Sequence, residues 1–282
     1  MAHILVPTDF SDNAYNALYY ATRLYPNEKC EITLIHTFED QFSSSTSRVD
    51  IGRNEKLYED LERNALQKLS AVKEKIEEDS ESLNIDIAIV TSAQPLHKMV
   101  NRIIADRNID FVAMGTKGAS GLKEVFVGTQ AVKLINNVKP IPLFLVPAGA
   151  QQGLPSNIAY ATDLKIDYAQ YPLEIVKEVM RAHKAKLHIT HIYNQISPGN
   201  TVENNYRKLK DKLADVEYNT HWLSSETGME TAVTTFVSEH KIDLLVLMFH
   251  KSGFLKKIFK KSFVETSCFH THIPLLVLPE SY

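Results

Sequence analysis

Cysteine is scarce in this sequence, which carries only Cys30 and Cys268 in 282 residues. Two thiols cannot build a disulfide framework or a four-cysteine zinc site, and they suit a reducing compartment. Long apolar runs are missing too. The longest, such as Leu244–Phe249, has the length of a strand and falls far short of the ~18 residues of a membrane span. We therefore expect a soluble, cytoplasmic protein with no transmembrane segment and no export signal.

Neither sign of charge dominates the chain. Its 31 Lys and Arg against 34 Asp and Glu leave a formal net charge of −3, which argues against nucleic acid as a partner of the whole chain. The composition, 44% hydrophobic and 23% charged, is typical of globular proteins. At roughly 150 residues per domain, the length favours two domains.

The short motifs of common catalytic and metal sites are absent as well. Neither Gly-x-Ser-x-Gly nor His-Glu-x-x-His occurs. The 11 histidines form no metal-ligand pattern. His188 and His191, for example, are three apart on a predicted strand and should point to opposite faces. We expect no catalytic residues and no metal site.

The sequence repeats itself. Residues 4–10 have an echo 154 residues later, at 158–164, and the segment 141–147 returns 132 residues later as 273–279. Two further strand-like segments, at 32–36 and 109–113, recur in the same order at 187–191 and 242–246. We predict two domains, 1–148 and 154–282, of which the second is shorter in its middle.

Within the first half, the apolar period alternates between that of a strand and that of a helix. Strands are predicted at 4–6, 31–37, 86–91, 111–114 and 143–146, helices at 12–25, 54–82, 96–107 and 127–137, and a serine-rich loop at 39–52. Such alternation predicts right-handed βαβ units. Each half should be a doubly wound, Rossmann-like α/β domain with a mostly parallel sheet of flavodoxin-type strand order, the two halves being related by a pseudo-two-fold axis.

The last strand of each half, Leu143–Val146 and Leu275–Val277, is a short apolar run next to a proline. An exposed edge of this kind would invite aggregation. We expect the two strands to pair antiparallel within one chain, which would join the domains. Further assembly into a homodimer stays open.

Glycines cluster after the predicted fourth strand, at Gly115, Gly118, Gly121 and Gly128. Glycine lets backbone amides approach an anion, and a helix that starts near Gly128 adds free N–H groups and a positive dipole end. Glycines that merely make turns are the alternative. The loop is neither a Walker A loop nor a Gly-x-Gly-x-x-Gly fingerprint.

The pattern Gly115-x2-Gly118-x9-Gly128-Thr129 behind a hydrophobic strand resembles the ATP-binding motif of the universal stress protein family. Similar opening and closing strands in both halves indicate a tandem member. The resemblance implies ATP as cofactor, with Mg²⁺ left open, and it implies a site made of Pro7, Thr8, Asp9, Thr37, Met114, Gly115, Lys117, Gly118, Gly128, Thr129, Gln130 and Ala131.

The same resemblance implies roles for these residues. Pro7, Thr8 and Asp9 would border the adenine and ribose, and Thr37 would offer backbone groups to the adenine edge. Met114 and Gly115 would pass under the ribose, Lys117 and Gly118 would face ribose or phosphate, and 128–131 would hold the phosphates. Helix capping near Ser11 is the alternative for Asp9, and ordinary strand packing is the alternative for Thr37 and Met114.

The second half departs from this pattern. At the repeat offset of 133 residues, Gly115 falls on Met248, and all four glycines are lost. We expect that this half kept the fold and lost the nucleotide. A lysine-rich segment replaces the loop at 251–261, either as a surface for an anionic partner or membrane, or as a solvated loop.

Three functions fit these observations. The first is an ATP-binding stress or signalling protein in which the nucleotide biases conformation or partner choice, with hydrolysis slow or incidental. The second is an enzyme of similar fold, either a weak ATPase or a nucleotidyl or phosphoryl transferase. The third is an interaction module whose glycine loop is vestigial.

Overall fold

The structure is a computed structural model that describes residues 1–46, 51–116, 129–150, 152–162, 164, 167–168, 173–193, 200–224, 226, 229–248 and 273–279. The described residues up to Ile141 form one compact unit, unit 1, and those from Pro142 onward form a second, unit 2. No helix within the described ranges is long and apolar enough to cross a membrane. The lysine-rich segment at 251–261 lies outside the described residues.

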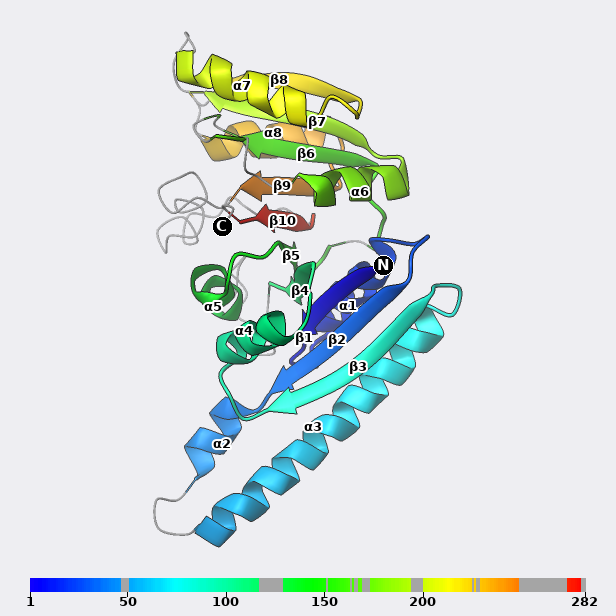
Figure 1. The fold of residues 1–282 in the computed structure, drawn as a ribbon, viewed down its shortest axis with the longest axis vertical. Coiled ribbons are helices and arrows are strands. Elements are labelled where there is room, and N and C mark those ends of the chain that lie inside the picture. Colours follow the sequence, from blue (N-terminus) through cyan, green and yellow to red (C-terminus); the bar gives the residue numbers. More distant parts are fainter. Residues whose placement is uncertain are drawn as a thin grey trace. The chain divides into compact units, whose positions relative to one another are not determined.

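Unit 1 alternates strands and helices as predicted. Its elements are β1 (Ala2–Pro7), α1 (Asp12–Arg23), β2 (Cys30–Thr37), α2 (Glu39–Ser45), α3 (Ile51–Asp79), β3 (Ile85–Ser92), α4 (Leu96–Asp106), β4 (Phe111–Gly115) and α5 (Thr129–Asn137). The strands lie in the order β3-β2-β1-β4, all parallel. Figure 1 shows β1, β2 and β3 side by side, with α3 lying along β3.

The helices cover both faces of this sheet. Because parallel crossovers are right-handed, the two steps from β1 to β2 and from β2 to β3 place α1 and α3 on one face, and the return step to β4 places α4 on the other. Hydrogen bonds agree with this: Arg23 of α1 donates to the backbone O of Asp79 in α3 at 2.6 Å. On the opposite face, Asn101 of α4 donates to the backbone O of Asn137 in α5 at 2.9 Å. The doubly wound α/β fold is therefore confirmed.

The flavodoxin-type strand order is wrong. In that order β1 would lie between β2 and β3, whereas here β1 lies between β2 and β4, and β3 lies outside β2. The order 3-2-1-4 is that of the first four strands of a dinucleotide-binding sheet, whose full order is 3-2-1-4-5-6. The alternation of strands and helices fixes the parallel pairing but leaves open the direction in which each crossover steps.

The predicted serine-rich loop at 39–52 is also wrong in its first part, because residues 39–45 form α2. Its aromatic side chains explain the helix. Phe38, 2% exposed, and Phe42 both meet the ring of Tyr58 in α3 edge-on, at centroid distances of 5.4 and 5.7 Å. This tertiary contact outweighs the weak helix propensity of the three serines at 43–45.

Unit 2 repeats the arrangement. Its elements are β5 (Leu143–Val146), β6 (Asn157–Thr162), α6 (Glu174–His183), β7 (Lys186–Tyr193), α7 (Asn200–Lys212), β8 (Tyr218–Ser224), α8 (Met229–Glu239), β9 (Leu244–Met248) and β10 (Leu275–Leu278). The strand order is β5-β10-β9-β6-β7-β8. The second repeat is shorter in its middle, as expected, because α7 has 13 residues where α3 has 29.

β5 precedes the predicted domain boundary in the sequence but belongs to unit 2 in space. It pairs antiparallel with β10, in a register that places Leu145 opposite Leu275 and Leu143 opposite Val277. All other described pairings of unit 2 are parallel. β10 is thus an interior strand with a partner on each side.

Candidate functional site

In unit 1 the crossovers leave β1 in both directions, since one neighbour is β2 and the other is β4. In open α/β sheets, ligands bind beyond the carboxyl ends of the strands at such a switch point. The register pairs Ile4 with Phe111 and Leu5 with Val112. The carboxyl ends of these two strands, Pro7 and Gly115, therefore reach the same edge. The structure brings together the segments at 7–9 and 114–115 that the sequence singles out.

A dense set of hydrogen bonds shapes the turn after β1. The Thr8 amide donates to the Ile35 carbonyl of β2 at 2.8 Å, which anchors the end of β1. Asp9 accepts from both the amide and the hydroxyl of Ser11, at 3.1 and 2.6 Å. Ser11 in turn accepts from the Ala14 amide at 3.2 Å as the N-cap of α1. Asp9 thus supports the helix cap, the alternative role weighed for it.

Phe10 is held in an unusual backbone conformation in this turn. Its φ of 67° lies in the left-handed region, which costs a non-glycine residue about 1–2 kcal/mol. Its amide donates to the Thr8 hydroxyl oxygen at 3.0 Å. Unit 2 repeats both features: Leu164 has φ 53°, and its amide donates to the Thr162 hydroxyl at 2.9 Å. The repeat therefore extends to the conformation of this turn.

His36, at the end of β2, lies against the same turn. Its ring is 4.3 Å from the Phe10 ring, centroid to centroid. Its Nδ1 is 2.8 Å from the Thr8 carbonyl oxygen. A carbonyl only accepts, so Nδ1 carries the proton. Burial lowers the pKa of His36, and the Thr8 carbonyl opposes that shift. The Nζ of Lys68, on α3, lies 5.5 Å from the centroid of the Phe10 ring. Sequence reasoning missed His36 and Lys68, because nothing local pairs them with Phe10.

Gly115 has a packing role that the sequence does not reveal. A Cβ added there would lie 2.8 Å from Oδ1 of Asn13 and 2.9 Å from its backbone O. The end of β4 therefore touches the first turn of α1 so closely that only glycine fits. Close approach to a ligand is no longer the sole reason for glycine at this position.

The remaining predicted residues are placed as follows. Met114 is buried, at 7% exposed, so its side chain packs as in an ordinary strand. Thr37 is half-buried and pairs with Ser92 of β3. α5 begins at Thr129, with Gln130 exposed and Ala131 buried. Lys117, Gly118 and Gly128 lie outside the described residues, as does the side chain of Thr129.

α5 begins at Thr129, and the start of a helix is in general able to bind an anion. The first amides of a helix have no partner inside the helix, and the dipole is positive there. Within the described residues, no group of three or more His, Cys, Asp or Glu side chains is placed to hold a metal ion.

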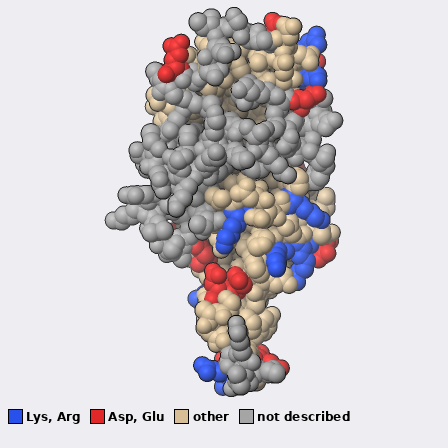
Figure 2. Space-filling model, turned by 90° about the vertical axis from the view of Figure 1, so that its left-hand side faces the viewer, with Lys and Arg blue, Asp and Glu red and all other residues tan. Residues whose placement is uncertain are grey.

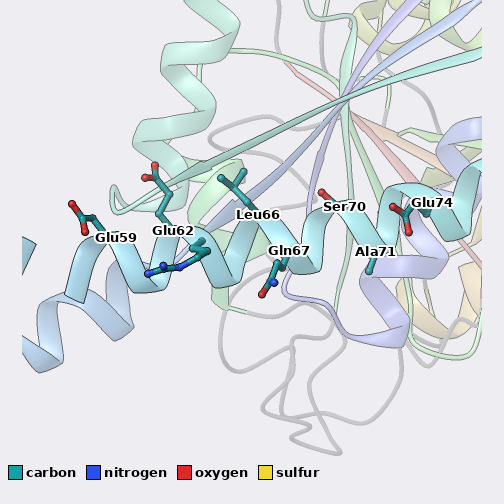
Figure 3. A pocket seen from close by; sticks show the side chains of 8 residues that line it. Glu59, Glu62, Leu66, Gln67, Ser70, Ala71 and Glu74 are labelled. Atoms are coloured by element: carbon teal, nitrogen blue, oxygen red, sulfur yellow. The ribbon is translucent and has the colours of Figure 1, made fainter. Parts of the chain in front are cut away.

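A groove of about 490 Å³ lies elsewhere, along α3. Its described lining side chains all come from that helix and include one cation, Arg63. Figure 3 labels the three carboxylates among them, Glu59, Glu62 and Glu74. Three carboxylates against one guanidinium disfavour a phosphate ligand. None of the predicted site residues that the structure describes lines it. Figure 2 shows that Lys and Arg side chains lie beside Asp and Glu side chains on the described part of the visible face.

In unit 2, the edge of the sheet that corresponds to the β1–β4 edge of unit 1 has a different environment. Thr162, the counterpart of Thr8, shares a hydrogen bond with the hydroxyl of Tyr168, a fully buried side chain. Met248, at the position of Gly115, is 9% exposed. Asp163 and the segment after β9 lie outside the described residues, so the loss of nucleotide from this half stays a prediction.

The fold and the edge at the strand switch define a doubly wound α/β protein. The sequence profile of the universal stress protein family matches residues 1–147. The chain is 25% identical over 148 residues to the universal stress protein YxiE of Bacillus subtilis, which covers 51% of this chain and 97% of that protein. It is 24% identical over 147 residues to the universal stress protein MJ0577 of Methanocaldococcus jannaschii, which covers 49% of this chain and 91% of that protein.

Solved structures extend the likeness of fold to both units. A universal stress protein from Archaeoglobus fulgidus superposes with a TM-score of 0.60 at 20% identity, over 98% of each chain. A universal stress protein of Pseudomonas aeruginosa gives 0.59 at 13% identity, over 99% of this chain and 93% of that one. The chain belongs to the universal stress protein family.

Proposed function

We propose that unit 1 binds one ATP per chain at the carboxyl ends of β1 and β4, and that the bound nucleotide biases conformation or partner choice in a stress response. The observation that carries the proposal is that the turn at 7–9 and the end of β4 at Gly115 reach one edge of the sheet. The next helix along the chain, α5, begins at Thr129. An anionic phosphate chain suits the amides of such a helix start.

The described residues fit an adenine nucleotide in two ways. Pro7 and Thr8 lie at the edge where the base and ribose would sit, and Thr8 is fixed by its bond to Ile35. Gly115, at the end of β4, lies at the same edge. Lys117, Gly118, Gly128 and Gln130 would approach ribose and phosphates, and Mg²⁺ would arrive with the phosphates. Asp9 and Thr37 would contact the ribose and the adenine edge.

The proposed switch needs no turnover of ATP, and we place it in the cytoplasm. The buried Cys30 thiol, whose pKa burial raises to about 11, would stay a thiol in a reducing compartment. We also propose that β5, which lies before the repeat boundary, holds the repeats 1–148 and 154–282 together by its pairing with β10.

Substituting Gly128 tests the site. Gly128→Val would block the approach of phosphate to the start of α5. Lys261→Val is the matched control, because Lys261 stands at the corresponding position of the second half, 133 residues later. We expect calorimetric titration with ATP to show binding in the wild type and in Lys261→Val and to show none in Gly128→Val. Unchanged affinity in Gly128→Val would overturn the assigned site.

The same preparation tests the enzymatic alternative. A single-turnover assay with labelled ATP and magnesium would show a transferred or released phosphate if the chain were an ATPase or a transferase. We expect ATP to be recovered intact over the lifetime of the complex. Turnover that is lost in Gly128→Val would instead assign catalysis to this site.

A further inference from the structure

Three histidines of unit 2 meet on the face of the sheet that α8 covers. We call His188 of β7, His221 of β8 and His240, which follows α8, the histidine cluster. Their ring centroids are 4.9 to 5.7 Å apart. The ring of Phe236 in α8 stacks on His240 at 4.1 Å and meets His221 edge-on at 4.8 Å. His191, on the other face of β7, lies against Trp222 instead, as the spacing of these two histidines predicts.

The hydrogen bond between His188 and His221 leaves no place for an extra proton on this pair. Nδ1 of His188 is 3.1 Å from Nε2 of His221, so a single proton lies between the two rings. Nε2 of His188 is buried and has no hydrogen-bond partner among the described residues. A buried orphan N–H is costlier than a buried lone pair. We therefore assign the proton to Nδ1 of His188, which donates to His221.

Acid disturbs this arrangement whether it charges His188 or His221. A proton on His188 would create an N–H at the buried Nε2, where it meets no acceptor. A proton on Nε2 of His221 would face the N–H at Nδ1 of His188. The only relief would be for the hydrogen of His188 to move from Nδ1 to the buried Nε2 of the same ring. Nδ1 of His240 lies 3.3 Å from the Phe236 carbonyl oxygen, to which it donates.

The surroundings of the cluster also disfavour its protonation. Burial lowers the pKa of His188 first, and His221, His240 and Lys186 lower it further. Burial and His240 likewise lower the pKa of His221. These neighbours come from β7, β8 and the end of α8, and no carboxylate is among them. Glu239, the residue before His240, is exposed.

We propose that the histidine cluster is an acid-sensitive latch, and that charging it loosens α8 from β7 and β8. Both histidines with lowered pKa values bind a proton more readily in the opened state. Stability is therefore present at neutral pH and is lost as pH falls through the ordinary histidine value of about 6.5 toward the lowered values. Opening would uncover the α8 face of unit 2 on acidification.

Hydrogen exchange of the full chain tests the latch. We would measure amide opening in α8 between about pH 7.5 and 5.5, corrected for the intrinsic exchange rate. Each proton taken up on opening raises the opening constant by up to about tenfold per pH unit. We expect such a rise in the wild type. His188→Phe keeps a ring of similar shape but cannot be charged, so its opening constant should rise far less.

His191→Phe is the matched control, because it makes the same change on the same strand but on the other face. It should keep the wild-type slope. An α8 opening constant independent of pH in the wild type, or an undiminished slope in His188→Phe, would overturn the proposal. If His188→Phe does not fold, imidazole NMR titration of the wild type decides. Midpoints below about 6.5 for His188 and His221 support the latch, and midpoints at or above it refute it.

Discussion

Gly115→Ala should weaken the docking of α1 on β4. The new Cβ would lie 2.9 Å from the backbone O of Asn13, whereas ordinary contact begins near 3.4 Å. The strand and the helix must therefore separate by about 0.5 Å, a shift typical of overpacked sites, which cost about 1–3 kcal/mol. Asn13 Oδ1, at 2.8 Å, can rotate away, but the backbone O cannot.

Hydrogen exchange of the α1 amides is the suitable assay, because the single tryptophan, Trp222, reports on unit 2 alone. Gly115→Ala should lower the opening free energy of α1 by about 1–3 kcal/mol. Adding Asn13→Ala should restore only part of the lost opening free energy, because the clash with the backbone O of residue 13 remains. Gly52→Ala, on the exposed start of α3, is the control and should stabilise by up to about 1 kcal/mol. Equal stability of Gly115→Ala and wild type would refute the packing argument.

Three further predictions concern stability and reactivity. Val277→Pro removes a ladder N–H from β10, an interior strand with β5 on one side and β9 on the other, and should destabilise unit 2 by about 3 kcal/mol or more. The Trp222 unfolding transition should come earlier, and an unchanged midpoint would contradict the interior position of β10. Lys177→Met removes a buried ammonium 2.8 Å from Asp215 and should lower the free energy of unfolding by about 1–3 kcal/mol. Arg181→Gln, on the exposed side of the same carboxylate, should lower it by less than about 1 kcal/mol. Equal losses of the two variants in urea unfolding would argue against this difference. Cys30 should resist a thiol reagent at pH 8 in a variant without the other cysteine, because burial raises the pKa of its thiol to about 11; labelling of the native protein as fast as of the unfolded chain would disprove it.

Much of the fold could be predicted from the sequence because buried parallel strands leave strong apolar runs. The segments at 4–6, 111–114 and 143–146 each fall inside a strand of the structure. The order of the strands could not be read, since it depends on the direction of each crossover rather than on local pattern. α2 was missed because its helix depends on Phe38 and Phe42 meeting Tyr58, a contact that serine-rich propensity conceals.

The candidate site was predictable in position but less so in detail. Apolar strands followed by Thr8-Asp9 and by Gly115 mark an edge, and the register places both there. The contact between Gly115 and Asn13 joins residues about 100 positions apart, and the tilted ring contact between Phe10 and His36 joins residues 26 positions apart. Such long-range packing leaves no periodic signal along the chain.

Amide NMR of the full chain titrated with ATP tests most directly whether one ATP binds at the β1–β4 edge of unit 1. We predict saturable shifts at Thr8, Gly115 and Gln130, with Thr162 and Met248 of unit 2 unchanged. Saturable shifts at Thr162 and Met248 instead, or no shift in either unit at millimolar ATP, would contradict it.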